Sequence, residues 1–137
     1  LSHIPDEDEA VIIHGDFSLG KLVFDAAEPC VIAVLGWERA TLGHPLADVA
    51  HNCLPWHFAP SQYAGLRGLD LAEQGIPTQE EYLIHYRQCG GYAESVNAFH
   101  LAFTLFRRAM EESGNGDAAQ VFALARRGVE LVDGIQK

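Results

Sequence analysis

Basic residues are scarce in this chain of 137 residues. It has 9 lysines and arginines against 19 aspartates and glutamates, which gives a formal net charge of −10 with the histidines neutral. Binding to nucleic acid or to an anionic membrane surface needs patches of lysine and arginine, so the composition argues against both functions. The acidic surplus by itself indicates no particular substrate.

Long apolar runs and a disulfide framework are lacking as well. No segment approaches the roughly 20 apolar residues of a membrane-spanning helix, and the first residues lack the pattern of a signal peptide. Cys30, Cys53 and Cys89 are an odd number, widely spaced and set among apolar residues. This pattern is typical of small buried side chains in a reducing compartment. We therefore expect a cytoplasmic protein.

Apolar residues are sufficient for one compact domain, which we expect to cover residues 1–137. Hydrophobic residues make up 48% of the sequence, and the length falls within the range of single domains. Short apolar runs at 10–13, 21–24 and 30–35 predict strands. The turn-forming segment 25–29 predicts that the last two strands form a hairpin.

From Pro45 onward the sequence has helical periodicity. Apolar residues recur over 46–54 at the spacing of one helical face, and Pro45 suits the first position of a helix. Thr78 with Glu81 three residues later predicts a capping box, and Gly90 predicts the end of that second helix.

Two further helices complete the predicted fold. The third has a regular apolar stripe formed by Val96, Phe99, Phe103, Phe106 and Met110. We expect Phe99, Phe103 and Phe106 of this stripe to lie in the core. The fourth is expected to begin at Asp117. Short strands followed by about four helices predict an α+β fold.

The motif that indicates chemistry is His14-Gly15-Asp16, which directly follows the first predicted strand. An aspartate at the end of a strand, followed by a short loop and a hairpin, places a carboxylate at the mouth of the fold. Kinase-like enzymes keep the group that accepts the proton of the substrate hydroxyl in such a place.

These residues resemble the catalytic loop and hairpin of the aminoglycoside phosphotransferase and choline kinase family. The chain is most similar to the subgroup whose domain is fused to some acyl-CoA dehydrogenases. The resemblance rests on His14-Gly15-Asp16 and on Trp37-Glu38, and it continues through residues 41–43, 45–50, 52–57, 68–70, 75–77 and 80–82. It implies the C-terminal lobe of a protein-kinase-like fold, ATP with Mg²⁺ as cofactors, and a small-molecule hydroxyl as phosphate acceptor.

The resemblance also implies roles for individual residues. Asp16 matches the catalytic base of the family, and His14 matches the residue that braces the catalytic loop. Asp48 matches the helix aspartate that supports this loop from behind. Trp37 and Glu38 match the residues beside the metal-binding aspartate.

Departures from the family pattern fall on the metal ligands. Lys21 stands where the family has a metal-binding asparagine, and Gly36 stands where it has a metal-binding aspartate. Glycine supplies no ligand and lysine repels a divalent cation, so we expect no metal site here and doubt ATP binding by this chain. Only thirteen residues precede His14 and no glycine-rich phosphate loop is present, so we expect the nucleotide-binding lobe to be absent.

Several residues have more than one interpretation. Lys21 is either an inactivating substitution or a cation that contacts a phosphate in place of the metal, and we favour the first. His44, His51 and His57 do not have metal-ligand spacing, and we expect scattered surface histidines. Trp56 and Tyr63 either line an acceptor pocket or pack under the long loop that follows.

Two functions remain open. The first is a small-molecule phosphotransferase domain, impaired here by truncation and by the loss of its metal ligands. The second is an inactive, pseudokinase-like module for binding or assembly. A missing lobe would leave apolar surface exposed, so we also expect self-association or pairing with another chain.

Overall fold

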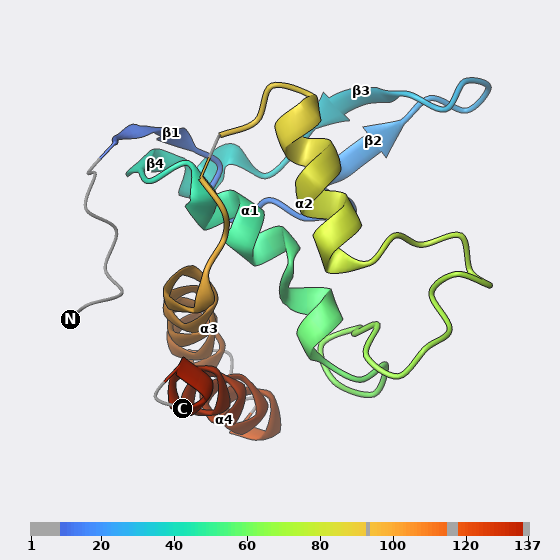
Figure 1. Cartoon of the computed structure of the whole chain (residues 1–137). Helices are drawn as coiled ribbons and strands as arrows, with labels where there is room; N and C mark the ends of the chain where they lie inside the picture. Colours follow the sequence, from blue (N-terminus) through green and yellow to red (C-terminus); the bar gives the residue numbers. More distant parts are fainter. Residues whose placement is uncertain (1–8, 93, 115–117, 136–137) are drawn as a thin grey trace.

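The structure is a computed structural model that describes residues 9–92, 94–114 and 118–135. Short strands lie at one end and the helix pair α3–α4 lies at the other, with α1 between them (Figure 1). The elements in chain order are β1 (Val11–Ile13), η1 (Leu19–Lys21), β2 (Leu22–Phe24), β3 (Val31–Val34), η2 (Trp37–Arg39), β4 (Thr41–Gly43), α1 (Leu46–Asn52), η3 (Leu54–His57), α2 (Gln79–Gln88), α3 (Ala98–Ser113) and α4 (Ala118–Ile135). The predicted α+β class is confirmed.

The strands form two separate antiparallel pairs. β2 and β3 make the predicted hairpin, with Leu22 opposite Val34. β1 pairs with β4, with Val11 opposite Gly43. The strand β4 has no counterpart in the sequence prediction, because Thr41-Leu42-Gly43 contains a single large apolar residue and so gives no apolar run. In this antiparallel register Ile13, at the end of β1, lies opposite Thr41, at the start of β4. The loop after β1 therefore lies beside the residues that precede β4, and Asp48 of α1 also contacts this loop.

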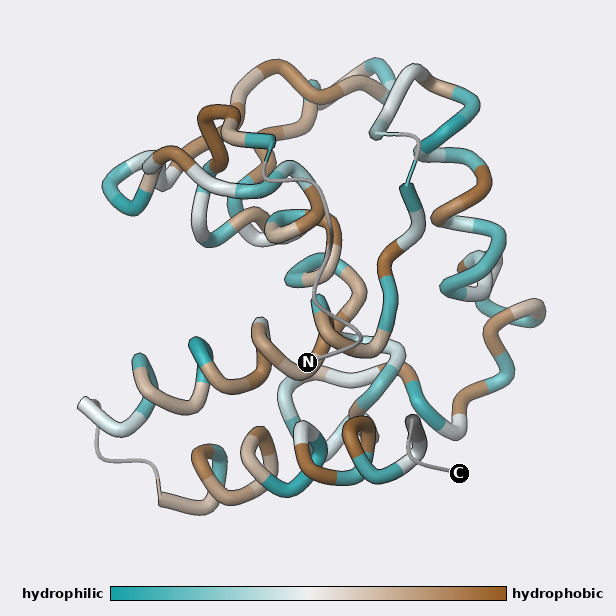
Figure 2. Tube along the Cα trace, turned by 60° about the vertical axis from the view of Figure 1, so that its left-hand side comes forward, coloured by the Kyte–Doolittle hydropathy of each residue, from teal (hydrophilic) through white to brown (hydrophobic). Residues whose placement is uncertain are grey.

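The core forms where α1 and η3 meet α3 and α4. One buried cluster contains Leu54, Phe58, Leu105 and Leu124. A second cluster joins Ala50 and Cys53 to Leu101. Figure 2 shows α3 and α4 side by side, and they make the most extensive contact of the fold.

The expectation that the aromatic stripe of α3 lies in the core is wrong. Phe103, Phe106 and Met110 are exposed, whereas Leu101, Thr104, Leu105 and Ala109 are buried. The helix is rotated so that Arg108, near this buried face, also reaches Asp16. Periodicity alone favours the most apolar face of a helix, but the position of a partner carboxylate depends on the tertiary fold.

Helix ends follow local sequence signals. Thr78 and Glu81 form the predicted capping box, in which the Glu81 N–H donates to Thr78 Oγ1 at 3.2 Å. Gly90 follows α2 with φ +86°, as a helix-terminating glycine does. The predicted start of the last helix, Asp117, lies outside the described residues.

Two of the three cysteines depart from expectation. Cys53 is buried, but Cys30 and Cys89 are exposed, so the prediction that all three are buried is wrong.

Large apolar residues are exposed on the strands β1 and β4, among them Ile12 (74%) and its cross-strand partner Leu42 (71%). In the part of the chain that the structure describes, no helix is long and apolar enough to cross a membrane.

Candidate active site

The loop after β1 is tightly built around Gly15. This glycine is buried and has φ +80°. A Cβ at this position would lie 2.5 Å from the carbonyl oxygen of Arg39. No L-residue side chain fits at such a distance, so the His14-Gly15-Asp16 turn requires glycine both for its backbone angle and for space.

Asp48, in the first turn of α1, holds this loop from behind. Its Oδ2 accepts a hydrogen bond from the His14 backbone N–H at 2.6 Å, and its Oδ1 accepts from the Gly15 N–H at 2.9 Å. Both donors belong to buried residues and would otherwise lack partners. These two bonds are the contacts that the expected loop-supporting role needs.

His14 braces the loop from inside. Its Nδ1 accepts from the Asp16 backbone N–H at 3.2 Å, and its Nε2 lies 2.8 Å from the Leu35 carbonyl oxygen. A carbonyl can only accept, so Nε2 carries the proton and donates. The ring also packs against Trp37, with 4.7 Å between centroids. Trp37 and Glu38 are both exposed on η2, directly after Gly36.

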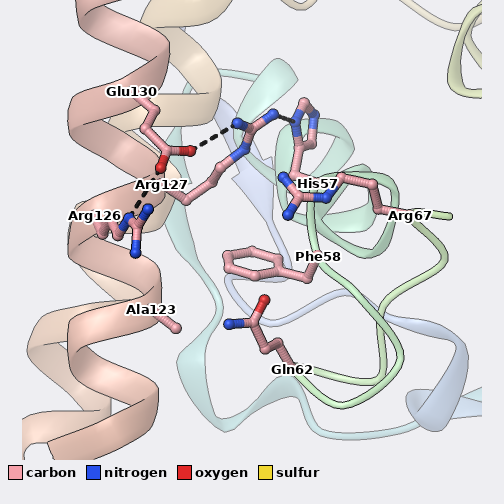
Figure 3. A pocket seen from close by; sticks show the side chains of 8 residues that line it. All are labelled: His57, Phe58, Gln62, Arg67, Ala123, Arg126, Arg127 and Glu130. Atoms are coloured by element: carbon pink, nitrogen blue, oxygen red, sulfur yellow. Dashed lines mark hydrogen bonds and ion pairs between the residues drawn. The ribbon is translucent and has the colours of Figure 1, made fainter.

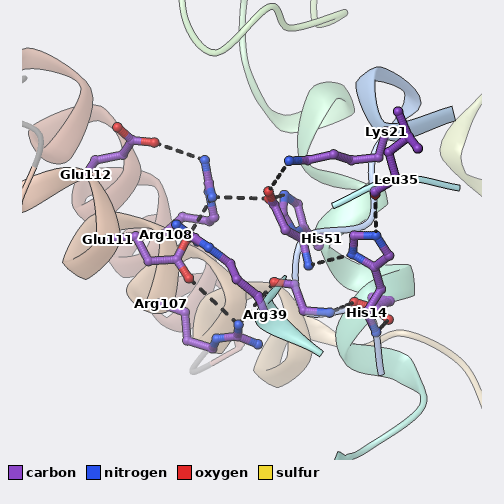
Figure 4. Close-up of polar contacts among 12 residues, drawn as sticks. His14, Lys21, Leu35, Arg39, His51, Arg107, Arg108, Glu111 and Glu112 are labelled. Atoms are coloured by element: carbon purple, nitrogen blue, oxygen red, sulfur yellow. Dashed lines mark hydrogen bonds and ion pairs between the residues drawn. The ribbon is translucent and has the colours of Figure 1, made fainter. Parts of the chain in front are cut away.

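Three cationic or titratable side chains surround the Asp16 carboxylate (Figure 4). Lys21 Nζ lies 3.1 Å from Oδ2, Arg108 NH1 lies 3.4 Å from Oδ1, and His51 Nε2 lies 3.8 Å from Oδ1. Burial acts to raise the pKa of Asp16. The hydrogen bond from Lys21 and the charges of His51, Lys21 and Arg108 outweigh burial, so the pKa of Asp16 lies below its ordinary value.

Arg108 joins Asp16 to an acidic cluster on the same helix. Its NH1 donates to Glu111 Oε2 at 2.7 Å, and its NH2 donates to Glu112 Oε1 at 2.9 Å. The neighbouring Arg107 donates to the Gly15 carbonyl oxygen at 3.3 Å. Sequence reasoning missed both arginines. They lie 92 residues from the loop, and only the packing of α3 brings them to it.

His51 corrects the expectation of scattered surface histidines. It is buried beside Asp16, and burial together with the charge of Arg108 lowers its pKa to about 4, so it is neutral at pH 7. His44 and His57 are partly buried. His44 Nδ1 accepts from the Leu46 N–H at 3.2 Å, so this histidine supplies a hydrogen bond to the start of α1. None of the three is a scattered surface residue.

The residues at the two family metal positions do not fit a divalent cation. Gly36 has no side chain, and its backbone is left-handed at φ +85°. The Lys21 side chain lies over it, since a Cβ on Gly36 would be 3.0 Å from Lys21 Nζ and 2.9 Å from Lys21 Cδ. The ammonium group therefore occupies the space between residue 36 and Asp16, and its charge would repel a metal ion there.

A cavity of about 930 Å³ opens beside Asp16. Trp56 and Tyr63 line it, and both also pack against other rings. Trp56 lies against Tyr82 at 5.4 Å between centroids and donates from Nε1 to the Pro77 carbonyl oxygen, and Tyr63 lies 5.5 Å from Phe58. Tyr63 has φ +53° and the next residue has φ +47°. Consecutive non-glycine residues in the left-handed region indicate a strained loop at the wall of this cavity.

Comparison with known proteins agrees with this geometry. Residues 1–92 match the model of the phosphotransferase enzyme family. The match covers more than half of the sequence, and the chain belongs to this family. A crystal structure of a protein from Ralstonia eutropha classed as an aminoglycoside phosphotransferase is 40% identical, with a TM-score of 0.74 over 95% of this chain and 43% of that one. The predicted kinase-like fold is therefore confirmed.

Several longer proteins contain a similar segment. Acyl-CoA dehydrogenase family member 10 of Mus musculus is 42% identical over 109 residues, which are 77% of this chain and 10% of that protein. Family member 11 of Homo sapiens is 40% identical over 113 residues, or 80% of this chain and 14% of that protein. The predicted resemblance to the subgroup associated with acyl-CoA dehydrogenases is confirmed. The chain spans only a small part of these relatives.

Proposed function

We propose that this chain is a phosphotransferase domain for a small-molecule hydroxyl in which phosphoryl transfer is impaired. The observation that supports this most directly is the pairing of Asp16 with Lys21 at 3.1 Å, at the wall of a cavity of about 930 Å³. Asp16, the carboxylate that would bind the acceptor hydroxyl, is present. The cation beside it is the ammonium group of Lys21 rather than a metal ion.

The acceptor side follows from the position of Asp16. A hydroxyl group bound in the cavity would lie within reach of the carboxylate, which could orient it and accept its proton. Apolar and aromatic side chains, among them Trp56, Leu66 and Ile76, line the rest of the cavity and provide surface for the body of a small molecule. Family membership implies ATP as the phosphate donor.

The impairment follows from the neighbours of Asp16. Lys21 and Arg108 stabilise its ionised form, so its carboxylate is a weaker base than an ordinary aspartate. Phosphoryl transfer needs charge neutralisation on the transferred group, which a metal supplies when the site can hold one. Gly36 and Lys21 provide no ligands for it.

An inactive module for binding or assembly is the second candidate. The exposed apolar residues of β1 and β4, Ile12 and Leu42, favour it, because apolar surface of this kind is common where another chain docks. On this reading the cavity beside Asp16 binds no small alcohol, and self-association or a partner lobe covers the strands.

Ligand binding separates the two candidates. A panel of small alcohols can be screened by saturation-transfer NMR on the full chain, with and without ATP. For a phosphotransferase domain we expect at least one alcohol that binds. Its signal should be lost in Trp56→Ala and kept in Trp37→Ala, since of these two residues only Trp56 lines the cavity. Absence of any such alcohol, together with concentration-dependent association abolished by Leu42→Ser, would instead support the assembly module.

A further inference from the structure

A second cavity, away from Asp16, gathers cations in a chain that is poor in them. It has a volume of about 170 Å³ and lies between helix α4 and the loop that follows η3 (Figure 3). Arg67, Arg126 and Arg127 line it, which is three of the nine lysines and arginines of a chain with net charge −10. Glu130 is the one acidic residue among the eight that line it.

The positive charges that line this cavity outnumber the negative ones. Glu130 is shared, because its Oε1 accepts from Arg126 Nε at 3.1 Å and its Oε2 accepts from Arg127 NH1 at 3.0 Å. Among the described residues 9–92, 94–114 and 118–135, Arg67 makes no ion pair. Three guanidinium groups against one carboxylate leave about two positive charges uncompensated.

The remaining titratable group, His57, adds no negative charge. Its Nδ1 lies 3.4 Å from Arg127 NH2, which can only donate, so Nδ1 is unprotonated. Burial, with the charges of Arg127 and Arg67, lowers the pKa of His57 below its ordinary value. The ring is therefore neutral at pH 7 and serves as an acceptor for Arg127.

The three arginines of this cavity belong to backbone segments that the core holds in place. The Arg67 N–H donates to the Phe58 carbonyl oxygen at 2.8 Å, and the buried Phe58 ring anchors that side of the loop in the core. The other two arginines follow Leu124, which is fully buried in α4. In addition, the Nε–H of Arg127 is shielded from solvent and has no partner among the described residues. The Arg127 guanidinium, which contacts Glu130 and His57, is thus a donor already held in place for an acceptor that enters the cavity.

We propose that this cavity binds a phosphate group, either as inorganic phosphate or as the phosphate of a small metabolite. A phosphate dianion matches the two uncompensated positive charges, and its unprotonated oxygens accept the hydrogen bonds that guanidinium groups donate. The site is separate from the Asp16 cavity. No described residue lines both cavities. Trp56 and Leu66 line the Asp16 cavity, whereas their sequence neighbours His57 and Arg67 line this one.

Calorimetric titration of inorganic phosphate into the full chain at low ionic strength tests the proposal. Acetate at the same ionic strength serves as the reference anion. We expect saturable binding with a Kd of about 1 mM or tighter, because several guanidinium groups converge on a partly open site. Arg67→Gln should weaken it about fivefold or more, whereas Arg87→Gln, the same charge change on α2, should leave it within about twofold.

A second variant pair should act in the opposite direction. Glu130→Gln removes the internal competitor and should tighten phosphate binding about threefold or more, while Glu28→Gln in the hairpin turn should not. Glycerol 3-phosphate, titrated in parallel, identifies the source of the ligand, since tighter binding than inorganic phosphate indicates an esterified phosphate. No saturable phosphate binding, or equal losses in Arg67→Gln and Arg87→Gln, would overturn the proposal.

Discussion

Replacing Asp48 with alanine should destabilise the whole fold, although Asp48 is neither catalytic nor fully buried. Its carboxylate accepts two backbone hydrogen bonds, from His14 at 2.6 Å and from Gly15 at 2.9 Å. A hydrogen bond to a charged group contributes about 1.5–3 kcal/mol, and a carboxylate in the first turn of a helix adds about 0.3–1 kcal/mol. Allowing for partial solvent exposure, we expect Asp48→Ala to lower the free energy of unfolding by about 3–4 kcal/mol.

Asp48→Asn should fall between the wild-type chain and Asp48→Ala. The amide keeps one acceptor oxygen but turns its NH₂ group toward the second backbone donor, so a loss of about 1–2 kcal/mol is expected. Glu28→Ala is the matched control, because it also removes one carboxylate but makes no side-chain hydrogen bond among the described residues. Its effect should stay within about 0.5 kcal/mol.

Urea unfolding at pH 7, followed by tryptophan fluorescence, measures these differences. The slope of the transition should be the same for all variants, so that a shifted midpoint reports stability alone. A loss of less than about 1 kcal/mol for Asp48→Ala, or a loss no larger than that of Glu28→Ala, would refute the reasoning that this carboxylate holds the loop.

Three further predictions follow from the same site. His51 has a folded-state pKa of about 4, below its unfolded value of about 6.5, so protons bind the unfolded chain more tightly and stability is lost as the pH falls. His51 should contribute about 2 kcal/mol to the stability lost between pH 7 and pH 5, so His51→Gln should reduce the loss seen in chemical unfolding by about this amount. An unchanged pH dependence in that variant would contradict the burial argument. Lys21→Met should raise the pKa of Asp16 as followed by carboxyl NMR, because it removes a hydrogen bond and a positive charge from the carboxylate; an unmoved pKa would show that the pairing is not formed. Gly15→Ala should destabilise the chain more than Gly36→Ala when melting temperatures are compared, because the added Cβ meets a backbone carbonyl at the first position and a movable lysine side chain at the second; equal losses would count against the packing described for the loop.

The sequence was most informative where a structure is set by neighbouring residues. The capping box of Thr78 and Glu81 and the β2–β3 hairpin each depend on a few consecutive side chains, and both were predicted. The loop residues His14, Asp16 and Asp48 were located through family resemblance, and the structure brings the three together.

Long-range packing decided what the sequence could not predict. Arg108 reaches Asp16 across 92 positions of sequence, so no local pattern links the two. The apolar stripe of α3 also misled, because its Phe106 faces outward while the polar Thr104 faces the core. His51 looked like one of several scattered histidines, and only its burial next to Asp16 distinguishes it.

Metal binding beside Asp16 distinguishes an impaired site from an intact one. Paramagnetic broadening by Mn²⁺ in the presence of ATP can be measured on the backbone amide signals of residues 14–17, in the wild-type chain and in the Lys21→Asn/Gly36→Asp double variant. We expect broadening only in the double variant, because Lys21 fills the metal position and Gly36 provides no ligand. Equal broadening in the wild-type chain, or none in either protein, would contradict this expectation.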